Sequence, residues 1–462
     1  MYLRKLWLTW IKVFRKSLNK LTRFKNSKTM TYKKIIIALF LSPAWLVQAQ
    51  TTGDSLTLSG ILNEVIHNYP AIQKTQSDLD ASDAKINLSK TAYLPEVSLT
   101  ANYALIGPTS EITIPGMGSF HLYPAHNYSA SVNVSENIYD FGKAKKNIAF
   151  EQLSKQMVGL NVEQLKQKLS SAMVSNFYSI VFLQEAIKIK NEELTTLKAH
   201  AQFVEKKAAT GSATKYEVLT TKVRISTNET QMADLVNTLQ IQIGQLNSYL
   251  GKSQETKLIV KKELLQPNII PNNDSLFNFA FNHRSEMKLI RQKSTLATSR
   301  LQIVSAVNNP SLNFMGSGGI KNGYLPDMMA ATPNFTLGIG LKVPLFDANR
   351  SKYSKIQAQT DIDGNVQETE LVRRNIVNEV LESKVNALSA QDKVQLSELQ
   401  LQQAQEAYQL AKTSFNIGAI TNLELMYSFT AVTNSKLALL KTKIDYTISL
   451  YRLKIALGEQ IY

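Results

Sequence analysis

The sequence contains no cysteine and only five histidines among its 462 residues. The lack of cysteine excludes disulfides, thiolate metal ligands, cysteine nucleophiles and a lipid-modified N-terminal cysteine. The histidines show no i, i+4 pairing and no metal-ligand spacing, and neither a G-x-S-x-G motif nor a glycine-rich phosphate loop is present. Their positions are His67, His121, His126, His200 and His283. We weigh a secreted enzyme against these absences and expect no enzyme, no cofactor and no metal site.

Acidic residues are missing from residues 1–49, which hold eleven of the 52 lysines and arginines. The formal net charge of +16 is therefore concentrated there, and the rest of the chain carries 41 basic against 36 acidic residues. So small a surplus removes most of the case for a nucleic-acid partner or for binding to anionic lipid.

Residues 30–49 have the pattern of a secretory signal peptide. A charged start is followed by the apolar run 35–41 and by a small residue, Ala49, at the expected cleavage site. The run is shorter than the roughly 20 residues that span a bilayer, which disfavours a permanent membrane anchor. Residues 1–29 form a basic extension, either an amphipathic helix or the product of a mistaken start upstream of Met30. We expect an exported protein.

Proline is absent from residues 125–266 and from residues 345–462. Because proline breaks helix interiors, both stretches are free to be helical. Helices over 143–207 and 351–415 would each reach roughly 100 Å at 1.5 Å per residue. Their mixture of apolar and polar residues fits long helices that pack on one another along one face and meet water along the other.

The chain consists of one unit present twice. GSATKYEVL at 211–219 matches GAITNLELM at 418–426, at an offset of 207 residues. The same offset relates Ile-Tyr-Asp at 138–140 to Leu-Phe-Asp at 345–347. Further upstream the offset becomes 215, so the halves differ in length between about residues 105 and 128, where a loop would absorb the change.

Each half contains segments in which apolar and polar residues alternate, the period that predicts a strand. These segments are 95–105, 128–135 and 334–343, with a weaker one around Leu312 and Phe314. They predict one strand pair over about 95–139 and a second over about 310–345. A helical period over 58–90 predicts one helix before the first pair.

Four strands cannot form a closed barrel, although their length suits the outer membrane. A transmembrane strand needs about 9 to 11 residues, and the smallest bacterial barrels have about eight strands. An open edge in lipid would leave backbone groups unpaired at a cost of several kcal/mol each. We therefore expect several chains to share one barrel; a soluble sheet that packs one face on a helix is the alternative.

Two turns between the long helices, at 208–214 and 415–421, carry the same signals. Each has a glycine that can adopt the left-handed conformation after a helix, followed by a Thr-x-x-Glu capping box that restarts the next helix. The glycines are Gly211 and Gly418, and the capping boxes pair Thr214 with Glu217 and Thr421 with Glu424. Local capping explains these residues by itself, and a docking or pore-mouth role is compatible with it.

These residues resemble the TolC-like outer-membrane efflux proteins, or outer membrane factors. The resemblance covers Leu58 to Gly458; its most specific features are the duplicated G-x-x-T-x-x-E turn, the strand-to-helix junctions and the terminal Leu-Gly. It implies an α+β membrane protein in which a long α-helical coiled-coil barrel continues a transmembrane β-barrel. Three chains would each contribute four strands from two tandem structural repeats.

The resemblance also implies a domain organisation. The first repeat is expected over 50–250 and the second over 274–462. The segment 251–273, which contains Pro267 and Pro271, would link them and form an equatorial belt.

The implied function is the outer-membrane channel of a tripartite efflux or type I secretion system, in a Gram-negative bacterium and with a large periplasmic part. Its partners would be a periplasmic adaptor and an inner-membrane pump or ABC transporter. The residues expected at the periplasmic tip and pore entrance are Gly211, Thr214, Glu217, Gly418, Thr421, Glu424 and Tyr427. In one member type a second acidic position corresponds to Tyr427, and a basic gate position to Ile420. The alternative is an adaptor-like coiled-coil protein, which would have one long hairpin instead of two equal halves.

Overall fold

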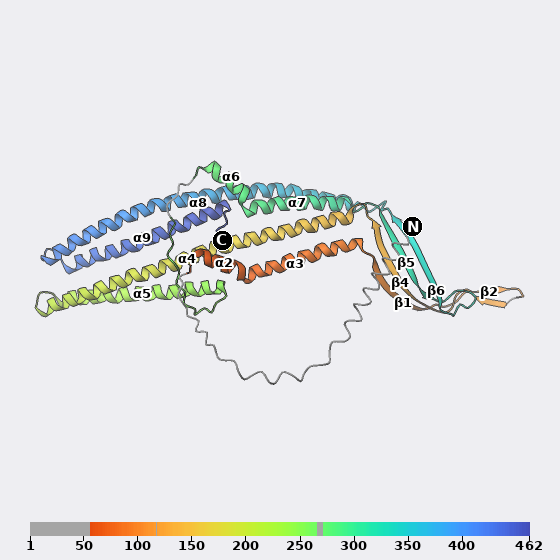
Figure 1. The fold of residues 1–462 in the computed structure, drawn as a ribbon, viewed down its shortest axis with the longest axis horizontal. Helices are drawn as coiled ribbons and strands as arrows, with labels where there is room; N and C mark the ends of the chain where they lie inside the picture. The colour runs from red at the N-terminus through yellow and green to blue at the C-terminus, as the bar shows by residue number, and fades with distance from the viewer. Residues whose placement is uncertain (1–55, 117, 266–270) are drawn as a thin grey trace, which may run out of the picture. The chain divides into compact units, whose positions relative to one another are not determined.

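The computed structural model describes residues 56–116, 118–265 and 271–462 (Figure 1). The expected signal peptide at 30–49 and the basic extension at 1–29 lie outside these residues.

Two short helices precede the first strand pair, where the sequence pattern predicts one helix over 58–90. They are α2 (Leu58–Asn68) and α3 (Pro70–Lys90), followed by a 3-10 turn η1 (Thr91–Tyr93). The prediction of a continuous helix is wrong at Tyr69, whose ψ of 126° is extended. Pro70 explains the break, because its ring disfavours helical geometry at the preceding residue while suiting the first position of a new helix.

Four strands form one antiparallel sheet in the order β1-β4-β5-β6. The strands are β1 (Glu96–Leu105), β4 (His126–Tyr139), β5 (Ser311–Lys321) and β6 (Thr332–Lys342). The register aligns Leu99 with Val132, Val132 with Gly318, and Gly318 with Phe335. The two central strands therefore come from different halves of the chain, and β1 and β6 are the edges.

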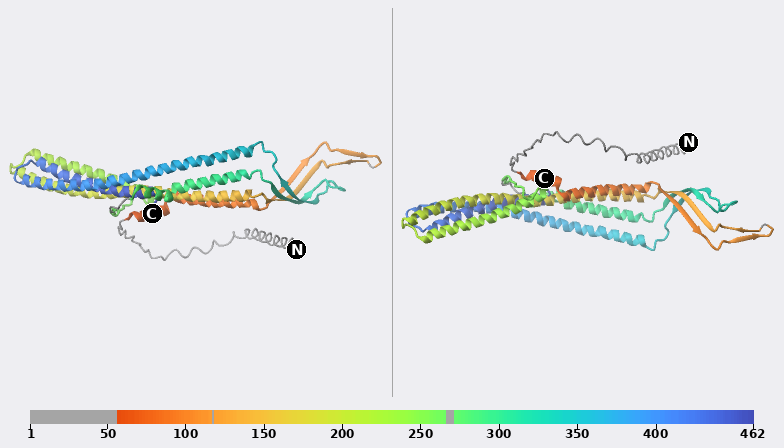
Figure 2. Two further views of the ribbon diagram at one scale, coloured as in Figure 1. Left: turned by 90° about the horizontal axis from the view of Figure 1, so that it is seen from above. Right: turned by 90° about the horizontal axis from the view of Figure 1, so that it is seen from below.

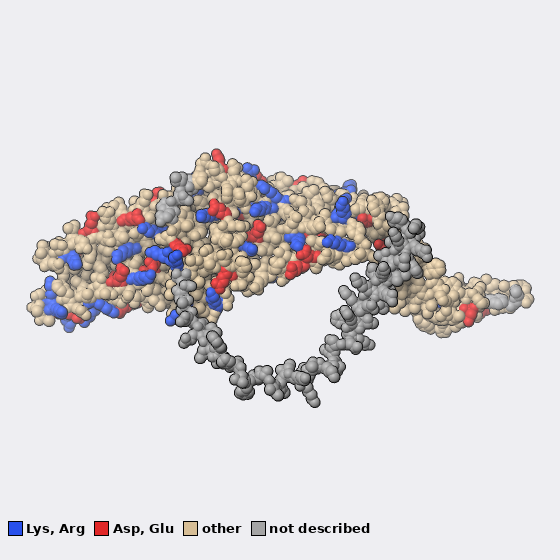
Figure 3. Space-filling view, in the orientation of Figure 1, with Lys and Arg blue, Asp and Glu red and all other residues tan. Residues whose placement is uncertain are grey.

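One face of this sheet is apolar and exposed. Leu99 is 75% exposed and Phe335 is 80% exposed, values typical of charged surface residues and not of leucine or phenylalanine. The residues between them on the same strands, among them Ser98, Asn133 and Thr336, place hydroxyl and amide groups on the other face. Figure 3 shows few charged residues over the strands on the side in view, in contrast to the helices.

The connection between β1 and β4 contains a hairpin that the sequence pattern does not predict. Its strands are β2 (Glu111–Ile114) and β3 (Gly118–His121). This is the region that the change of offset marks as a loop. The corresponding connection in the second half, between β5 and β6, is shorter. The hairpin therefore accounts for the extra residues of the first half.

The long helices come in two hairpins of matching dimensions. Helices α4 (Lys143–Ala209) and α8 (Arg350–Asn416) have 67 residues each, and α5 (Lys215–Leu250) and α9 (Asn422–Leu457) have 36 each. Helix α4 packs against α5 and also against α9, which joins the two hairpins. Figures 1 and 2 show both hairpin turns at the end remote from the sheet. Within the described part of the chain, no helix has both the length and the apolar character to cross a membrane.

The main core lies where α2 meets the long helices. Phe177 and Tyr178 of α4 are completely enclosed there, among residues of α2, α5 and α9. The hydroxyl of Tyr178 donates to the carbonyl of Glu263 over 2.9 Å, so the segment after α5 is fixed to this core. A second core lies under α6 (Asn273–His283) and α7 (Ser285–Ser305), against α8 and α9.

An aspartate three residues before each of the two longest helices bonds to the first turn of that helix. The Asp140 carboxylate accepts from the backbone N–H of Ala144 over 2.6 Å, and the Asp347 carboxylate accepts from that of Ser351 over 3.0 Å. The bonds from Ser351 and from Asn308 lower the pKa of Asp347 to about 2. These carboxylates satisfy N–H groups that the first helical turn leaves without partners.

Candidate functional site at the turns between the long helices

The candidate site consists of the two turns and the side chains packed behind them. At the first turn, Gly211 has a φ of 76° and its N–H donates to Ala208, while Ser212 donates back to Lys207. At the second turn, Gly418 has a φ of 75°. The prediction that these glycines reverse the chain in the left-handed conformation is confirmed.

Both predicted capping boxes are present. Thr214 accepts from the N–H of Glu217 over 3.2 Å, and Glu217 accepts from the N–H of Thr214 over 3.0 Å. The same pair of bonds joins Thr421 and Glu424 at 3.3 and 2.7 Å. The bonds from Thr421 lower the pKa of Glu424, so this exposed carboxylate stays charged in mildly acidic solution. Each carboxylate therefore caps its own helix and also places a negative charge at the tip.

Polar contacts near the turns cross from the first hairpin to the second, and sequence reasoning missed them. Nε2 of His200 in α4 donates to Oδ1 of Asn422 in α9 over 2.6 Å. Arg224 of α5 donates to the hydroxyl of Thr430 over 3.0 Å and lies 5.1 Å from the ring centroid of Tyr427. No local pattern predicts these contacts, because they join residues about 200 positions apart.

The predicted tip residues divide between the two turns. Glu217 and Glu424 bond within their own turns, whereas Tyr427 reaches the other hairpin through Arg224. The guanidinium of Arg224 therefore places a positive charge beside Tyr427. A guanidinium over an aromatic face is held electrostatically as well as by packing.

Behind the turns, aromatic residues line a cavity of about 270 Å³ between α4 and the second hairpin. The rings of His200 and Phe203 lie 5.9 and 6.4 Å from that of Phe415. Nζ of Lys207 lies 5.0 Å from the ring centroids of both Phe203 and Phe415. Burial of the imidazole and the nearby charge of Lys207 lower the pKa of His200, partly offset by its bond with Asn422.

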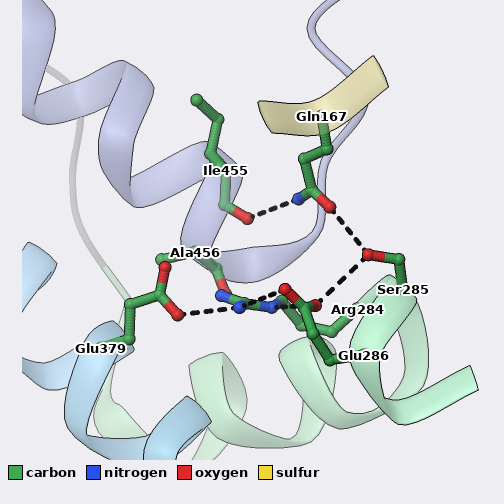
Figure 4. Close-up of polar contacts among 7 residues, drawn as sticks. All are labelled: Gln167, Arg284, Ser285, Glu286, Glu379, Ile455 and Ala456. Carbon is green, nitrogen blue, oxygen red and sulfur yellow. Dashed lines mark hydrogen bonds and ion pairs between the residues drawn. The ribbon is translucent and has the colours of Figure 1, made fainter. Parts of the chain in front are cut away.

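A second polar centre lies where α7 meets α4, α8 and the end of α9 (Figure 4). Arg284, between α6 and α7, is only 5% exposed. It donates to the carboxylate of Glu286 at 2.8 and 2.9 Å, to that of Glu379 at 2.8 Å, and to the carbonyl of Ala456 at 3.1 Å. Arg284 thus ties α7 to α8 and to the end of α9.

The charges at this centre stabilise one another. Burial alone would lower the pKa of Arg284, but its bonds with Glu286 and Glu379 raise it. Burial would raise the pKa of Glu286, and the bonded guanidinium instead lowers it. Ser285 continues the network to Gln167 of α4 over 3.0 Å. Among the described residues, no group of three or more His, Cys, Asp or Glu side chains is arranged to hold a metal ion.

The chain matches the family described as "Outer membrane efflux protein" over residues 61–252 and 277–459. It is 20% identical over 440 residues to outer membrane protein TolC of Vibrio cholerae, covering 92% of this chain and 95% of that protein. It is also 20% identical to alkaline protease secretion protein AprF of Pseudomonas aeruginosa, covering 93% of this chain and 89% of that protein. The solved structure of outer membrane protein VceC from Vibrio cholerae superposes with a TM-score of 0.69 at 15% identity, covering 88% of this chain and 97% of that one.

The fold is thus that of the outer-membrane efflux channels, in which long helical hairpins carry a small sheet at one end. The chain belongs to the outer membrane efflux protein family. It is an exit duct of the outer membrane with a large periplasmic part. None of these comparisons supports the alternative of a periplasmic adaptor.

Proposed function

We propose that three copies of this chain form one passive duct, in which a shared 12-stranded barrel continues into a tunnel of helices. The observation that carries this proposal is the open sheet. Its edges β1 and β6 run in opposite directions, so β6 of one chain can pair antiparallel with β1 of the next. Closure in this way leaves no edge in the lipid.

The two faces of the sheet support the same arrangement. The exposed apolar residues would face lipid, and the hydroxyl and amide groups between them would line the lumen. Strands of 10 to 14 residues are long enough to cross the outer membrane when tilted. A soluble sheet would instead bury such residues as Leu99 and Phe335.

The matched lengths of the helices support two tandem repeats, over 50–250 and 274–462, joined by the segment 251–273. Three chains would then bring six helical hairpins into one ring. The duct would do no chemistry of its own, and its tips would meet a periplasmic adaptor and an inner-membrane pump or ABC transporter. The tip residues Gly211, Thr214, Glu217, Gly418, Thr421, Glu424 and Tyr427 would form the periplasmic entrance.

The absence of native cysteine allows a direct test of the shared barrel. Thr100→Cys on β1 would be combined in turn with Thr332→Cys, Asn334→Cys and Thr336→Cys on β6, and the protein oxidised in outer membranes. We expect one of these pairs to give covalent dimers and trimers on denaturing gels, and the single variants to give none.

Native mass measurement on the detergent-extracted protein should show a trimer. A monomer that conducts ions in planar bilayers would contradict the proposal.

A further inference from the structure

The β2–β3 hairpin is a two-stranded ribbon at the end of the chain opposite the periplasmic tips. Figures 1 and 2 show it beyond the end of the sheet that is remote from the long helices. Its stem continues from β1 and β4, since the N–H of Ile106 donates to the carbonyl of Ala125 over 2.8 Å and the N–H of Leu122 donates to that of Ser110 over 2.9 Å. Among the described strands, β2 and β3 pair only with each other. A two-stranded hairpin of this kind is marginally stable in water unless a further element covers its apolar face.

One face of the ribbon is polar. Nδ1 of His121 lies 3.2 Å from a carboxylate oxygen of Glu111, and the hydroxyls of Thr113 and Ser119 are 2.8 Å apart. The register pairs Glu111 with His121 and Thr113 with Ser119, so both contacts cross the hairpin. This face suits contact with water.

The other face of the ribbon is apolar and exposed. Ile112 and Ile114 lie two residues apart in β2, so strand geometry directs both side chains to the face opposite Glu111 and Thr113. Ile112 is 47% exposed and Ile114 is 43% exposed. The chain thus leaves both isoleucines partly uncovered. An exposed apolar face on a marginal hairpin indicates a cover from outside the chain.

The same hairpin of the two neighbouring chains can supply that cover. Strand β1 leads into the hairpin and is the edge that would pair with the next chain, so the rim of the shared barrel carries one hairpin from each chain. A barrel of 12 strands, spaced about 4.8 Å apart and tilted about 40°, has a radius of about 12 Å. The four residues of β2 span about 14 Å at about 3.4 Å per residue. Three hairpins that lean inward are therefore long enough to meet on the axis.

We propose that the hairpins of three chains pack Ile112 and Ile114 against one another on the threefold axis and so close the extracellular mouth of the duct. The inference rests on the proposed trimer, because one chain cannot complete this cap. The face with Glu111 and His121 would remain in water. Packing removes the isoleucines from water, and an apolar constriction of this kind excludes ions. Passage of cargo would require the three hairpins to part.

Single cysteines test the packing, because the chain has no native cysteine. Ile114→Cys would be treated with a short bifunctional maleimide in outer membranes. We expect covalent dimers on denaturing gels, since three cysteines near one axis allow one linked pair in each trimer. Thr113→Cys, on the polar face, is the matched control and should give at least tenfold less dimer. Failure of Ile114→Cys to cross-link, in a protein that native mass measurement shows to be a trimer, would overturn the cap and leave the duct in place.

A cysteine inside the barrel measures whether the mouth is closed. Asn133→Cys would lie on the polar face of β4, and intact cells would be treated with a maleimide on a polyethylene glycol chain too large to cross the outer membrane by other routes. We expect Ile112→Asn combined with Ile114→Asn to increase the rate of labelling at least tenfold. Thr113→Asn combined with Ser119→Asn makes two changes on the polar face and should leave the rate as it is with the native hairpin. Equal rates with all three hairpins would overturn closure of the mouth.

The outer leaflet of the membrane is the other cover that an apolar hairpin could find. In that case Ile114→Cys would react with a lipid-soluble maleimide and would not cross-link, and this result would overturn the cap. Native mass measurement and the disulfides between Thr100→Cys and β6, obtained on the same hairpin variants, separate loss of the cap from failure of the shared barrel or of folding.

Discussion

His200 donates a hydrogen bond from Nε2 to Oδ1 of Asn422 over 2.6 Å and thereby links the end of α4 to the beginning of α9. Asn422 is only 3% exposed, and its amide nitrogen donates in turn to Thr221 of α5. A chain of side-chain bonds therefore connects three of the four long helices at the tip. Loss of His200 would leave the buried amide oxygen of Asn422 without this hydrogen bond.

We predict that His200→Ala lowers the free energy of unfolding by about 1–3 kcal/mol, the cost of an unsatisfied buried acceptor at Asn422. Thermal unfolding followed by circular dichroism would measure it. The control is His67→Ala, since the exposed His67 bonds only to the carbonyl of Asn63 in its own helix. An effect of His200→Ala no larger than that of the control would show that the link contributes nothing.

The same residue predicts a pH dependence. The pKa of His200 is lowered in the folded protein, so the folded state favours the neutral imidazole. Its contribution to stability should be complete above the unfolded pKa of about 6.5 and should be lost as pH falls through the lower folded value. His200→Gln, which cannot titrate, should lack this component. Parallel loss of stability in both proteins on acidification would contradict the assignment.

Much of the tip could be predicted because its signals are local. A glycine after a helix and a Thr-x-x-Glu box act within a few residues, and both turns have the predicted geometry. The helix break at Arg284 is different, since no proline marks it and the bonds that hold Arg284 come from Glu379 and Ala456 far along the chain. The β2–β3 hairpin also escaped prediction, because an exposed hairpin has no buried face to impose alternation.

Replacing glycine by alanine should have opposite effects on stability in a turn and inside a helix. A methyl group at Gly211 would meet no atom within 4 Å, but its φ of 76° is strained for any residue with a Cβ. Gly211→Ala should therefore cost about 1–2 kcal/mol of stability. Gly159→Ala inside α4 also meets no atom and should instead stabilise the helix by up to about 1 kcal/mol. Equal effects at the two positions would show that the left-handed turn is not required.

Arg284 is predicted to contribute far more to the free energy of unfolding than a surface arginine does. Arg284→Met removes the partner of Glu286 and Glu379, and we expect a loss of about 3 kcal/mol, the lower end for a broken buried pair because Glu379 is 49% exposed. Arg374→Met is the control, as Arg374 is 74% exposed and pairs with Glu370 within one helix, a contact worth less than about 0.5 kcal/mol. Denaturant unfolding of both variants would measure the difference. Similar unfolding midpoints for the two variants would show that the polar centre around Arg284 does not stabilise the fold.

The last prediction concerns ion selectivity at the tip. Glu217 and Glu424 place six carboxylates at the tips of a trimer, and like charges so arranged attract cations. Arg224, stacked on Tyr427, adds three opposing charges. We therefore expect a modest cation preference, to which Glu424 contributes most because it is more exposed than Glu217.

Reversal potentials in planar bilayers would measure this preference. Glu424→Gln should reduce it, since glutamine can keep the bond from the N–H of Thr421 while removing the charge. Arg224→Gln should increase it. Because the pKa of Glu424 is lowered, the wild-type preference should persist on acidification to a pH below the ordinary glutamate value of about 4.3, and be lost only as pH falls through the lower folded value. Glu370→Gln, on exposed α8 surface away from the turns, is the control. Unchanged selectivity in Glu424→Gln would leave that carboxylate with its capping role alone.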